Sequence, residues 1–256
     1  MLLVVDVGNS HTVFGIFDEE RLAADWRFST HHGRTADEWA GEIAGALAIR
    51  GLSREAVDAA ILSSVVPPLT GTIEEMIGSF FGIEPLQVGP GIRTGIKILY
   101  ENPQEVGADR IVNSVAALAR VGGPAIVVDL GTATTFDALS TAGDYLGGII
   151  VPGLQISADS LFARAAKLPR VEVRRPPRLI GRNTVHSIQS GLYYGYASMI
   201  NGVLDLMRAE MEGDPKVIVT GGLARSLAPD LRGITLIDPN LTLEGLRLIY
   251  LKNRTA

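Results

Sequence analysis

The sequence contains no cysteine, which excludes disulfides, cysteine-ligated zinc and thiol nucleophiles. It also has no excess of positive charge, because 28 Asp and Glu outnumber 23 Lys and Arg, so it shows no basic surface for nucleic acid. The N-terminal apolar run before Asp6 has five residues, which is too short for a signal sequence or a membrane span. We therefore expect a soluble, cytoplasmic protein that contacts neither nucleic acid nor membrane.

The chain of 256 residues is 46% hydrophobic, which is enough to bury a sizeable core. β-Branched apolar runs alternate along it with segments of helical spacing, a pattern typical of an α/β fold. Strands are expected at 2–7, 12–17, 59–66, 84–88, 125–130 and 216–220, with further strands within 136–151. Helices are expected after the capping box Thr35–Glu38, at about 69–81, after Asn102 and at about 185–210, and a strand–helix pair closes the chain.

The helix expected after Asn102 carries a candidate catalytic group. Asn102, Pro103 and Glu105 have the chemistry of an N-cap, an N1 proline and an N3 glutamate. On this helix Asp109 lies about 200° around the axis from the apolar Ile111, so its carboxylate is expected to point away from the apolar stripe. It could there accept the proton of an attacking hydroxyl, although a solvated surface acid has the same pattern.

A nine-residue segment occurs twice. Residues 4–12 and 127–135 both read V-V-D-(V/L)-G-(N/T)-(S/A)-x-T, and the copies are offset by about half the chain. Such a duplication predicts two structurally related lobes. The domain boundary is expected between residues 115 and 116.

Each copy of the repeat has the residue types of a phosphate-binding loop. Glycine allows backbone N–H groups to approach an anion, hydroxyl and amide side chains add donors, and the aspartate can hold a cation against the phosphates. The same residues are also common in plain hairpin turns, but two matched copies favour the phosphate interpretation. A third glycine turn at Gly221 and Gly222 suits the adenosine side of an ATP site.

The two phosphate loops and the late T-G-G turn are together the signature of the acetate and sugar kinase/Hsp70/actin superfamily. Within it, the sequence closely resembles the type III pantothenate kinases. The matching segments are DVGNSHTVFGIF (6–17), NPQEVGADRIVN (102–113), DLGTATTFD (129–137), GGIIVPGL (147–154), GRNTVHSIQSG (181–191) and VTGG (219–222). The GADR and SIQSG segments are specific, whereas the phosphate motifs mark only the superfamily.

This resemblance implies a two-lobed actin-like (ribonuclease H-like) fold with a duplicated mixed β-sheet core and flanking helices, in lobes 1–115 and 116–256. It implies ATP-dependent phosphorylation of the pantothenate hydroxyl, which is the first step toward coenzyme A. It also implies a homodimer that requires Mg²⁺ and a monovalent cation, either K⁺ or NH₄⁺.

The resemblance also assigns roles to individual residues. The ATP phosphates would contact Asp6, Val7, Gly8, Asn9, Ser10, His11, Thr12, Val13 and Thr132. Pantothenate would contact Tyr100, Gly107, Ala108, Asp109, Arg110 and the Thr184 of a partner subunit. Asp109 would act as the base and Asp129 would bind the monovalent cation. The family more often has Thr-Asn at positions 10 and 11, but Ser10 keeps the hydroxyl.

Other interpretations of these residues remain open. Arg110 suits the carboxylate of pantothenate, but an internal ion pair with Asp109 or Glu105 is the alternative. Thr184 could simply cap the helix that follows it. That helix is apolar on most of its circumference, so it is expected in the core, with a dimer contact as part of its surface.

Two alternative functions belong to other classes. The first is another phosphotransferase or a phosphatase of the same superfamily, such as a sugar kinase, against which the segment Gly107–Arg110 argues. The second is a non-catalytic ATP-binding regulator, which would not need a base at position 109.

Overall fold

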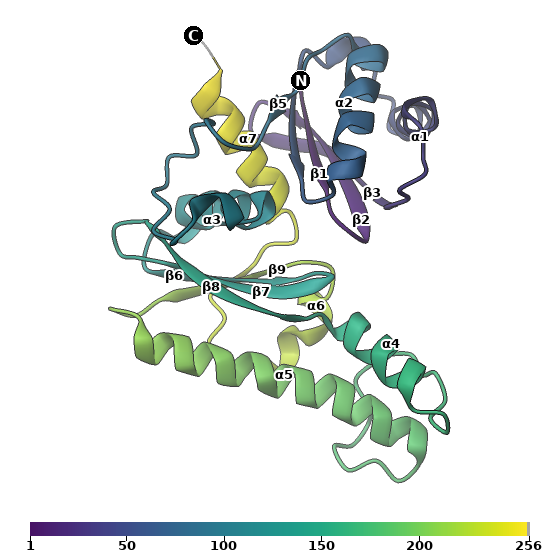
Figure 1. The fold of residues 1–256 in the computed structure, drawn as a ribbon, viewed down its shortest axis with the longest axis vertical. Coiled ribbons are helices and arrows are strands. Elements are labelled where there is room, and N and C mark those ends of the chain that lie inside the picture. Colours follow the sequence, from purple (N-terminus) through teal and green to yellow (C-terminus); the bar gives the residue numbers. More distant parts are fainter. Residues whose placement is uncertain (255–256) are drawn as a thin grey trace. The chain divides into compact units, whose positions relative to one another are not determined.

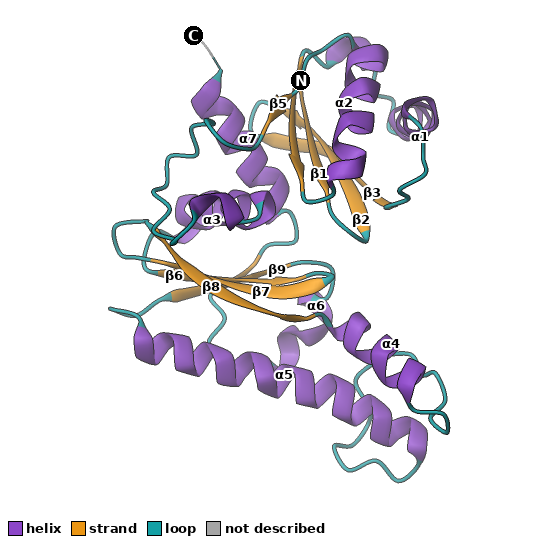
Figure 2. Ribbon diagram, in the orientation of Figure 1, coloured by secondary structure: helices purple, strands orange, loops and turns teal. Residues whose placement is uncertain are grey.

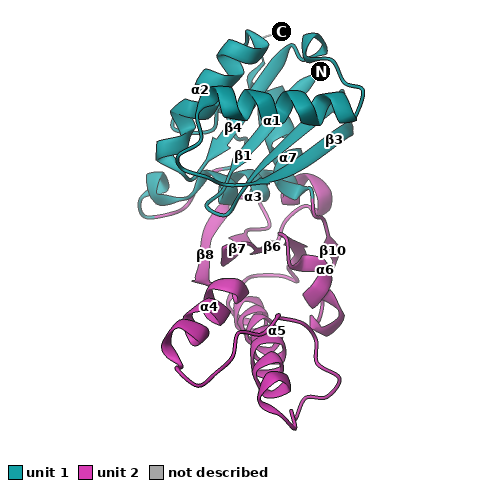
Figure 3. Cartoon of the chain, turned by 90° about the vertical axis from the view of Figure 1, so that its right-hand side faces the viewer, with its two compact units in different colours: residues 1–96, 101–116, 240–256 teal, residues 97–100, 117–239 magenta. Residues whose placement is uncertain are grey.

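The computed structural model describes residues 1–254 as two compact units (Figure 3). Unit 1 comprises residues 1–96, 101–116 and the described residues from 240, and unit 2 comprises residues 97–100 and 117–239. The expected boundary at 115/116 differs by one residue from the division after residue 116. The segment from residue 240 also differs from expectation, because it belongs to the first unit rather than the second.

Unit 1 is built on a mixed β-sheet (Figures 1 and 2). The sheet has five strands in the order β3-β2-β1-β4-β5. The strands are β1 (Leu2–Val7), β2 (His11–Asp18), β3 (Arg21–Ser29), β4 (Ala59–Ser64) and β5 (Leu86–Gln87). The first three strands form an antiparallel meander, and β4 runs parallel to β1 and β5 parallel to β4. The strand β1 is therefore central and is paired on both edges.

Helices cover both faces of this sheet. Alternate residues of β1 face opposite sides, so Leu3 and Val5 pack with α1 (Ala36–Ile49) and α2 (Pro67–Phe81). Leu2 and Val4 pack on the other face with α7 (Leu241–Asn253) and the first part of α3 (Ala108–Val121). By the same alternation Asp6 belongs to the face that α3 and α7 cover.

Unit 2 repeats this topology. Its sheet has the order β10-β9-β6-β7-β8, so β6 takes the central place that β1 has in unit 1. The strands are β6 (Ala125–Leu130), β7 (Ala133–Leu139), β8 (Tyr145–Pro152), β9 (Lys216–Thr220) and β10 (Leu236–Ile237). The pairings are again antiparallel for β6–β7–β8 and parallel for β6–β9 and β9–β10, which confirms the duplication that the repeat predicted.

One face of the second sheet packs against α4 (Leu154–Arg164), α5 (Thr184–Glu210) and α6 (Ala224–Leu227). From β6 this face takes Ile126, Val128 and Leu130, so Asp129 belongs to the opposite face. Short 3-10 turns occupy η1 (Arg54–Ala56), η2 (Pro103–Glu105) and η3 (Ala228–Asp230). Within residues 1–254 no helix combines the length and the apolar character needed to span a membrane.

The predicted helix start at Asn102 is wrong. Asn102 does act as an N-cap, but it caps the 3-10 turn η2, and Val106 then takes an extended conformation with ψ 120°. The α-helix α3 begins after Gly107, whose carbonyl accepts the N–H groups of Arg110 at 3.1 Å and Ile111 at 3.3 Å. Asp109 therefore lies in the first turn of α3 rather than in the middle of a helix.

The other predicted elements are confirmed with small shifts of their ends. Thr35 forms the predicted capping box with Glu38 and opens α1. The long helix α5 begins at Thr184, but its N-cap is Asn183, whose side chain accepts the His186 N–H at 2.8 Å. The proposed capping role of Thr184 is therefore wrong.

Two helical glycines should respond in opposite ways to alanine. A Cβ on Gly245 of α7 would lie 2.1 Å from the Val112 carbonyl oxygen of α3, whereas a Cβ on Gly45 of α1 would meet nothing within 4 Å. We expect Gly245→Ala to lower the free energy of unfolding by about 1–3 kcal/mol through overpacking. Gly45→Ala should raise it by about 0.5–1 kcal/mol through helix propensity. Urea denaturation measures both, and equal shifts of the same sign would contradict the close packing of α7 on α3.

Candidate active site

The first phosphate-loop candidate is the turn between β1 and β2. The Gly8 N–H donates to the His11 carbonyl at 3.0 Å, and Thr30, the residue that follows β3, holds the turn. The Thr30 N–H donates to the Ser10 carbonyl at 3.0 Å, and its hydroxyl donates to the Gly8 carbonyl at 2.7 Å. The side chains of Ser10 and His11 are exposed, whereas Thr12 is fully buried and its hydroxyl lies 3.0 Å from that of Thr30. The turn thus has a fixed shape with its polar tip in solvent.

The second loop, between β6 and β7, is one residue shorter. Asp6 pairs with Val13, but Asp129 pairs with Thr135, so the two hairpins differ by one position after the turn. The structural counterpart of Thr12 is therefore Thr134, which is also buried, and the sequence alignment of Thr12 with Thr135 is wrong. The sequence match did not reveal this difference because threonine occupies both positions 134 and 135.

Asp129 lies at the end of β6 between two strands that carry hydroxyls. It pairs with Thr135 of β7 and with Thr220 of β9. A Cβ on Gly221, whose φ is 90°, would lie 2.6 Å from Asp129 Oδ1, so only glycine leaves room for the carboxylate there. Carboxylate and hydroxyl oxygens are ligands that hard cations prefer, and this donor set fits the predicted monovalent cation.

A pair of buried hydroxyls was missed from the sequence. Ser63 of β4 stands beside Asp6 in the parallel register, as Thr220 stands beside Asp129 in unit 2. Ser63 is fully buried, and its Oγ has no hydrogen-bond partner among the described residues. The signal that could have found Ser63 and Thr220 is the duplication, because each lies near the end of an apolar strand that pairs in parallel with the central strand of its unit.

The Asp109 carboxylate is held at the N-terminus of α3. Its Oδ1 accepts the Arg110 N–H at 2.8 Å, and a Cβ on Gly107 would lie 2.6 Å from the same oxygen. Burial raises the pKa of the Asp109 carboxyl above its usual value, and this outweighs the lowering by the Arg110 N–H and guanidinium. A half-buried carboxylate with a raised pKa is suited to accept a proton near neutral pH. Asp109 is therefore not the fully solvated surface acid that was the alternative interpretation.

Unit 1 brings the first loop and the Gly107–Arg110 segment together. The Val65 N–H donates to the Val7 carbonyl at 3.0 Å, just before the turn. The Val65 side chain lies 3.8 Å from the position that a Cβ on Gly107 would occupy. The start of α3 therefore adjoins the carboxyl ends of β1 and β4. Arg110 is 7% exposed, so its guanidinium is not a solvated surface group.

The remaining predicted site residues lie in unit 2. Thr132 is in the second loop, where its carbonyl accepts the Gly153 N–H at 3.1 Å. Tyr100 lies beside Tyr145, with ring centroids 6.4 Å apart. Thr184 is the first residue of α5, and it is 12 positions from Tyr196, whose hydroxyl donates to Thr134 at 2.6 Å. That separation corresponds to about 18 Å along the helix, so Thr184 is remote from its own second loop.

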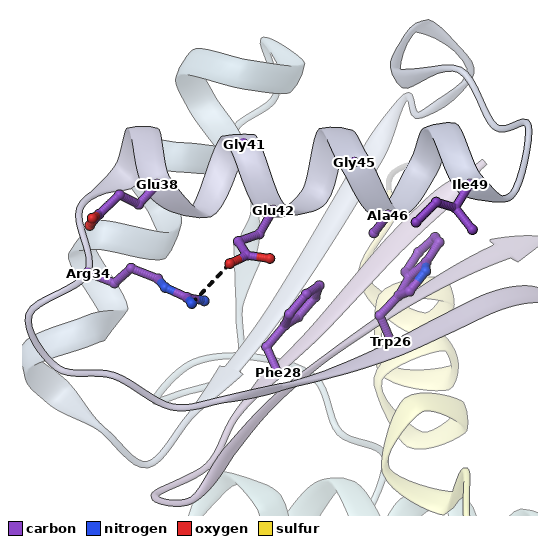
Figure 4. A pocket seen from close by; sticks show the side chains of 9 residues that line it. All are labelled: Trp26, Phe28, Arg34, Glu38, Gly41, Glu42, Gly45, Ala46 and Ile49. Atoms are coloured by element: carbon purple, nitrogen blue, oxygen red, sulfur yellow. Dashed lines mark hydrogen bonds and ion pairs between the residues drawn. The ribbon is translucent and has the colours of Figure 1, made fainter.

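The groove between α1 and β3 contains none of the predicted site residues (Figure 4). Its volume is about 590 Å³, and Trp26, Phe28 and Ile49 form its apolar wall. The cation that borders it, Arg34, is paired with Glu42 at 3.0 Å and stacks on Trp39.

The raised pKa of Asp109 has a consequence for stability. A raised pKa in the folded state means that folding favours the protonated carboxyl, so the ionised form destabilises the fold at neutral pH. This penalty is fully present above the folded-state pKa and disappears as pH falls below the unfolded value near 3.8. We expect Asp109→Asn to raise the melting temperature at pH 7, with a gain that shrinks as the pH is lowered.

The matched control is Asp37→Asn. Asp37 occupies the same second helical position in α1 but is exposed, so its substitution should lower the melting temperature slightly or leave it unchanged. Thermal melts of both variants between pH 4 and 8 (an interval set by the ordinary carboxylate and histidine range) measure the difference. A lower melting temperature of Asp109→Asn at pH 7 would contradict the inference that the buried, ionised Asp109 carboxylate destabilises the fold.

Comparison with known proteins places the chain in a family. The profile described as "Type III pantothenate kinase" matches residues 2–206. A protein of Syntrophotalea carbinolica named "Type III pantothenate kinase" is 52% identical over 254 residues, which cover 99% of this chain and 100% of that protein.

Solved structures of more distant proteins share the fold. The activator of the 2-hydroxyisocaproyl-CoA dehydratase from Clostridium difficile has a TM-score of 0.59 at 11% identity, over 100% of this chain and 98% of that one. The inorganic polyphosphate/ATP-glucomannokinase from Arthrobacter has a TM-score of 0.51 at 14% identity, over 98% and 99% of the two chains. This likeness confirms the two-lobed actin-like fold with its duplicated mixed sheets. With a family profile that covers most of its length and a relative that is half identical from end to end, this chain belongs to the type III pantothenate kinase family.

Proposed function

We propose that this chain transfers the γ-phosphoryl group of ATP to the hydroxyl of pantothenate, with Asp109 as the base. The observation that carries the residue assignment is the Asp109 carboxylate, which has a raised pKa and lies in the same unit as the first phosphate loop. The full-length relationship to proteins named type III pantothenate kinase supports the substrate. The product would be 4'-phosphopantothenate, the first intermediate toward coenzyme A.

The first loop would bind the ATP phosphates mainly through its backbone. The Gly8 N–H is used inside the turn, so the exposed tip residues Asn9, Ser10 and His11 would supply the donors to the phosphates. Burial and the nearby Arg27 lower the pKa of His11, so its imidazole is neutral at pH 7 and contributes a hydrogen bond rather than a charge. Thr12, which is fully buried, would shape the loop from beneath.

Asp109 would accept the proton of the pantothenate hydroxyl as its oxygen attacks the γ-phosphorus and ADP leaves. Arg110 would hold the pantothenate carboxylate, and Gly107, Ala108 and Tyr100 would also contact pantothenate. Phosphoryl transfer depends mostly on such positioning and on neutralised charge.

The charge on the phosphates would be neutralised by cations. Mg²⁺ would accompany ATP and neutralise part of the charge on its phosphates. Asp129 would hold a monovalent cation, K⁺ or NH₄⁺, with the hydroxyls of Thr135 and Thr220 beside it in the sheet. The use of ATP supports a cytoplasmic location.

A homodimer would complete the pantothenate pocket with the partner's Thr184. This assignment is supported by the separation of about 18 Å along α5 between Thr184 and Tyr196, which contacts Thr134 at the start of β7, next to the second loop. The N-terminal half of α5 also borders a surface groove with small residues, among them Gly191 and Gly195. The neighbouring Leu179 and Ile180 are 65% and 82% exposed, as expected for residues that a second copy covers.

One assay separates this function from its alternatives. Release of ADP is measured with pantothenate, with a panel of sugars and without an acceptor. Turnover with pantothenate alone supports the proposal, turnover with a sugar supports another phosphotransferase, and the absence of turnover with bound ATP supports a regulator.

Loss of the base should affect chemistry rather than nucleotide binding. We expect Asp109→Asn to lower kcat by about 10²–10⁴-fold, because proton transfer contributes a factor of that size. ATP affinity, measured by calorimetry, should change little, and Asp37→Asn should keep wild-type turnover. Wild-type turnover in Asp109→Asn would refute the assignment of the base.

The shared pocket predicts complementation between two defective subunits. In a mixed dimer of Asp109→Asn and Thr184→Ala chains, one of the two sites has both an intact Asp109 and an intact Thr184 from the partner. After mixing and subunit exchange, activity should recover to about one quarter of wild type, because half of the dimers are mixed and each has one complete site. Mixtures that remain as inactive as the separate variants would contradict the shared site.

A further inference from the structure

Unit 2 contains a buried aspartate–tyrosine pair to which none of the roles above applies. Asp137 of β7 and Tyr145 of β8 are both 0% exposed, and the Tyr145 hydroxyl donates to Asp137 Oδ1 at 2.8 Å. Burial of a carboxylate is unfavourable unless hydrogen bonds compensate it, and an apolar side chain would fill the same space without this cost. The pair therefore calls for an explanation beyond core packing.

Tyr145 determines the position of the segment that carries Tyr100. Its backbone N–H donates to the Lys97 carbonyl at 2.8 Å, and its carbonyl accepts the Leu99 N–H at 2.8 Å. These two bonds attach residues 97–99 to β8, and they leave the Tyr100 ring against the Tyr145 ring at 6.4 Å between centroids. Gly147, whose φ of 134° favours glycine, also lies beside the Tyr100 ring, because a Cβ there would be in van der Waals contact with it at 3.6 Å.

The second oxygen of Asp137 contacts Thr135, the strand neighbour of Asp129. Thr135 Oγ1 donates to Asp137 Oδ2 at 3.5 Å, and Thr135 is paired with Asp129 across β6 and β7. Side chains two positions apart on a strand share a face, so Asp129, Thr135 and Asp137 all belong to one face of the sheet. Asp137 thus contacts Thr135, the strand neighbour of the residue proposed for the cation, and Tyr145, whose ring lies beside the residue proposed for pantothenate.

We propose that Asp137 and Tyr145 are positioning residues that orient Tyr100 toward pantothenate and, through Thr135, Asp129 toward the monovalent cation. This inference rests on the proposed function, since it takes the roles of Tyr100 and Asp129 from it. Oδ1 of Asp137 accepts the Tyr145 hydroxyl and Oδ2 accepts the Thr135 hydroxyl. The contact with Tyr145 (the pantothenate arm) and the contact with Thr135 (the cation arm) can therefore be removed separately. Tyr145→Phe removes the pantothenate arm, Thr135→Val removes the cation arm, and Asp137→Asn weakens both.

The test measures four variants with saturating ATP. Tyr145→Phe should raise the KM for pantothenate about tenfold and leave the half-saturating K⁺ concentration unchanged, because one hydrogen bond to a charged group is lost. Thr135→Val should raise the half-saturating K⁺ concentration by several-fold and leave the pantothenate KM unchanged. Asp137→Asn should raise both. The KM for ATP should stay within about twofold throughout, because substitutions at separate sites usually act independently.

Phe136→Leu is the matched control for core disruption. Phe136 is fully buried on β7 between Thr135 and Asp137, but it faces the opposite side of the sheet, toward α5. It should lower the melting temperature without moving either constant. If Tyr145→Phe or Thr135→Val shifts both the pantothenate KM and the half-saturating K⁺ concentration, or if Phe136→Leu shifts either constant, the residues act only through stability. The proposal is then overturned.

Two binding measurements do not depend on turnover. Calorimetry with pantothenate should show weaker binding for Tyr145→Phe but not for Thr135→Val. The rise of melting temperature with KCl, against choline chloride at equal ionic strength, should be reduced for Thr135→Val but not for Tyr145→Phe. If the wild-type chain binds pantothenate, and every variant binds pantothenate and responds to K⁺ as the wild type does, the positioning role is refuted. A wild-type chain that binds no pantothenate would instead refute the proposed function and, with it, the Tyr100 arm.

Discussion

The structure depends on how its two central strands end. Both β1 and β6 are paired on each edge and covered on each face, so their first residues are almost entirely apolar and buried. Each strand then places an aspartate, Asp6 or Asp129, one residue before its end, followed within two positions by a glycine turn. A carboxylate at the rim of an apolar sheet needs polar surroundings, because its desolvation is unfavourable. The exposed turn, the neighbouring Ser63 or Thr220 and the space left by glycine supply these surroundings.

The two copies of this arrangement have diverged in what packs beside them. In unit 1 the N-terminus of α3 adjoins the strand ends and presents Asp109, whose carboxylate is half-buried. In unit 2 the corresponding polar residues come from the hairpin β7–β8, where Asp137 and Tyr145 lie on the Asp129 face. One fold unit thus carries the candidate base and the other carries the candidate cation site, although both have the same strand order. A duplicated scaffold therefore supports two different chemical tasks.

Local signals were sufficient wherever neighbouring residues determine the structure. The capping box at Thr35, the hairpin after each central strand and the duplication could be inferred from spacing and from the repeat. The start of α3 could not, because Asn102 makes an equally good cap for a 3-10 turn. The choice depends on Gly107, where the absence of a Cβ admits the Asp109 carboxylate. The difference in length between the two loops also escaped detection, since it is visible only in the register of β7 against β6.

The sequence by itself determined the duplicated α/β architecture, the resemblance to the family and the candidate residues, because apolar periodicity and short motifs are properties of the chain order. Only the tertiary structure decided that α7 (Leu241–Asn253) completes the first sheet's packing and that Ser63 stands beside Asp6. It also decided that Asp137 joins Tyr145 and Thr135 in one chain of contacts. These relations arise from strand register and burial, which bring distant residues together and set the free energy of a buried carboxylate.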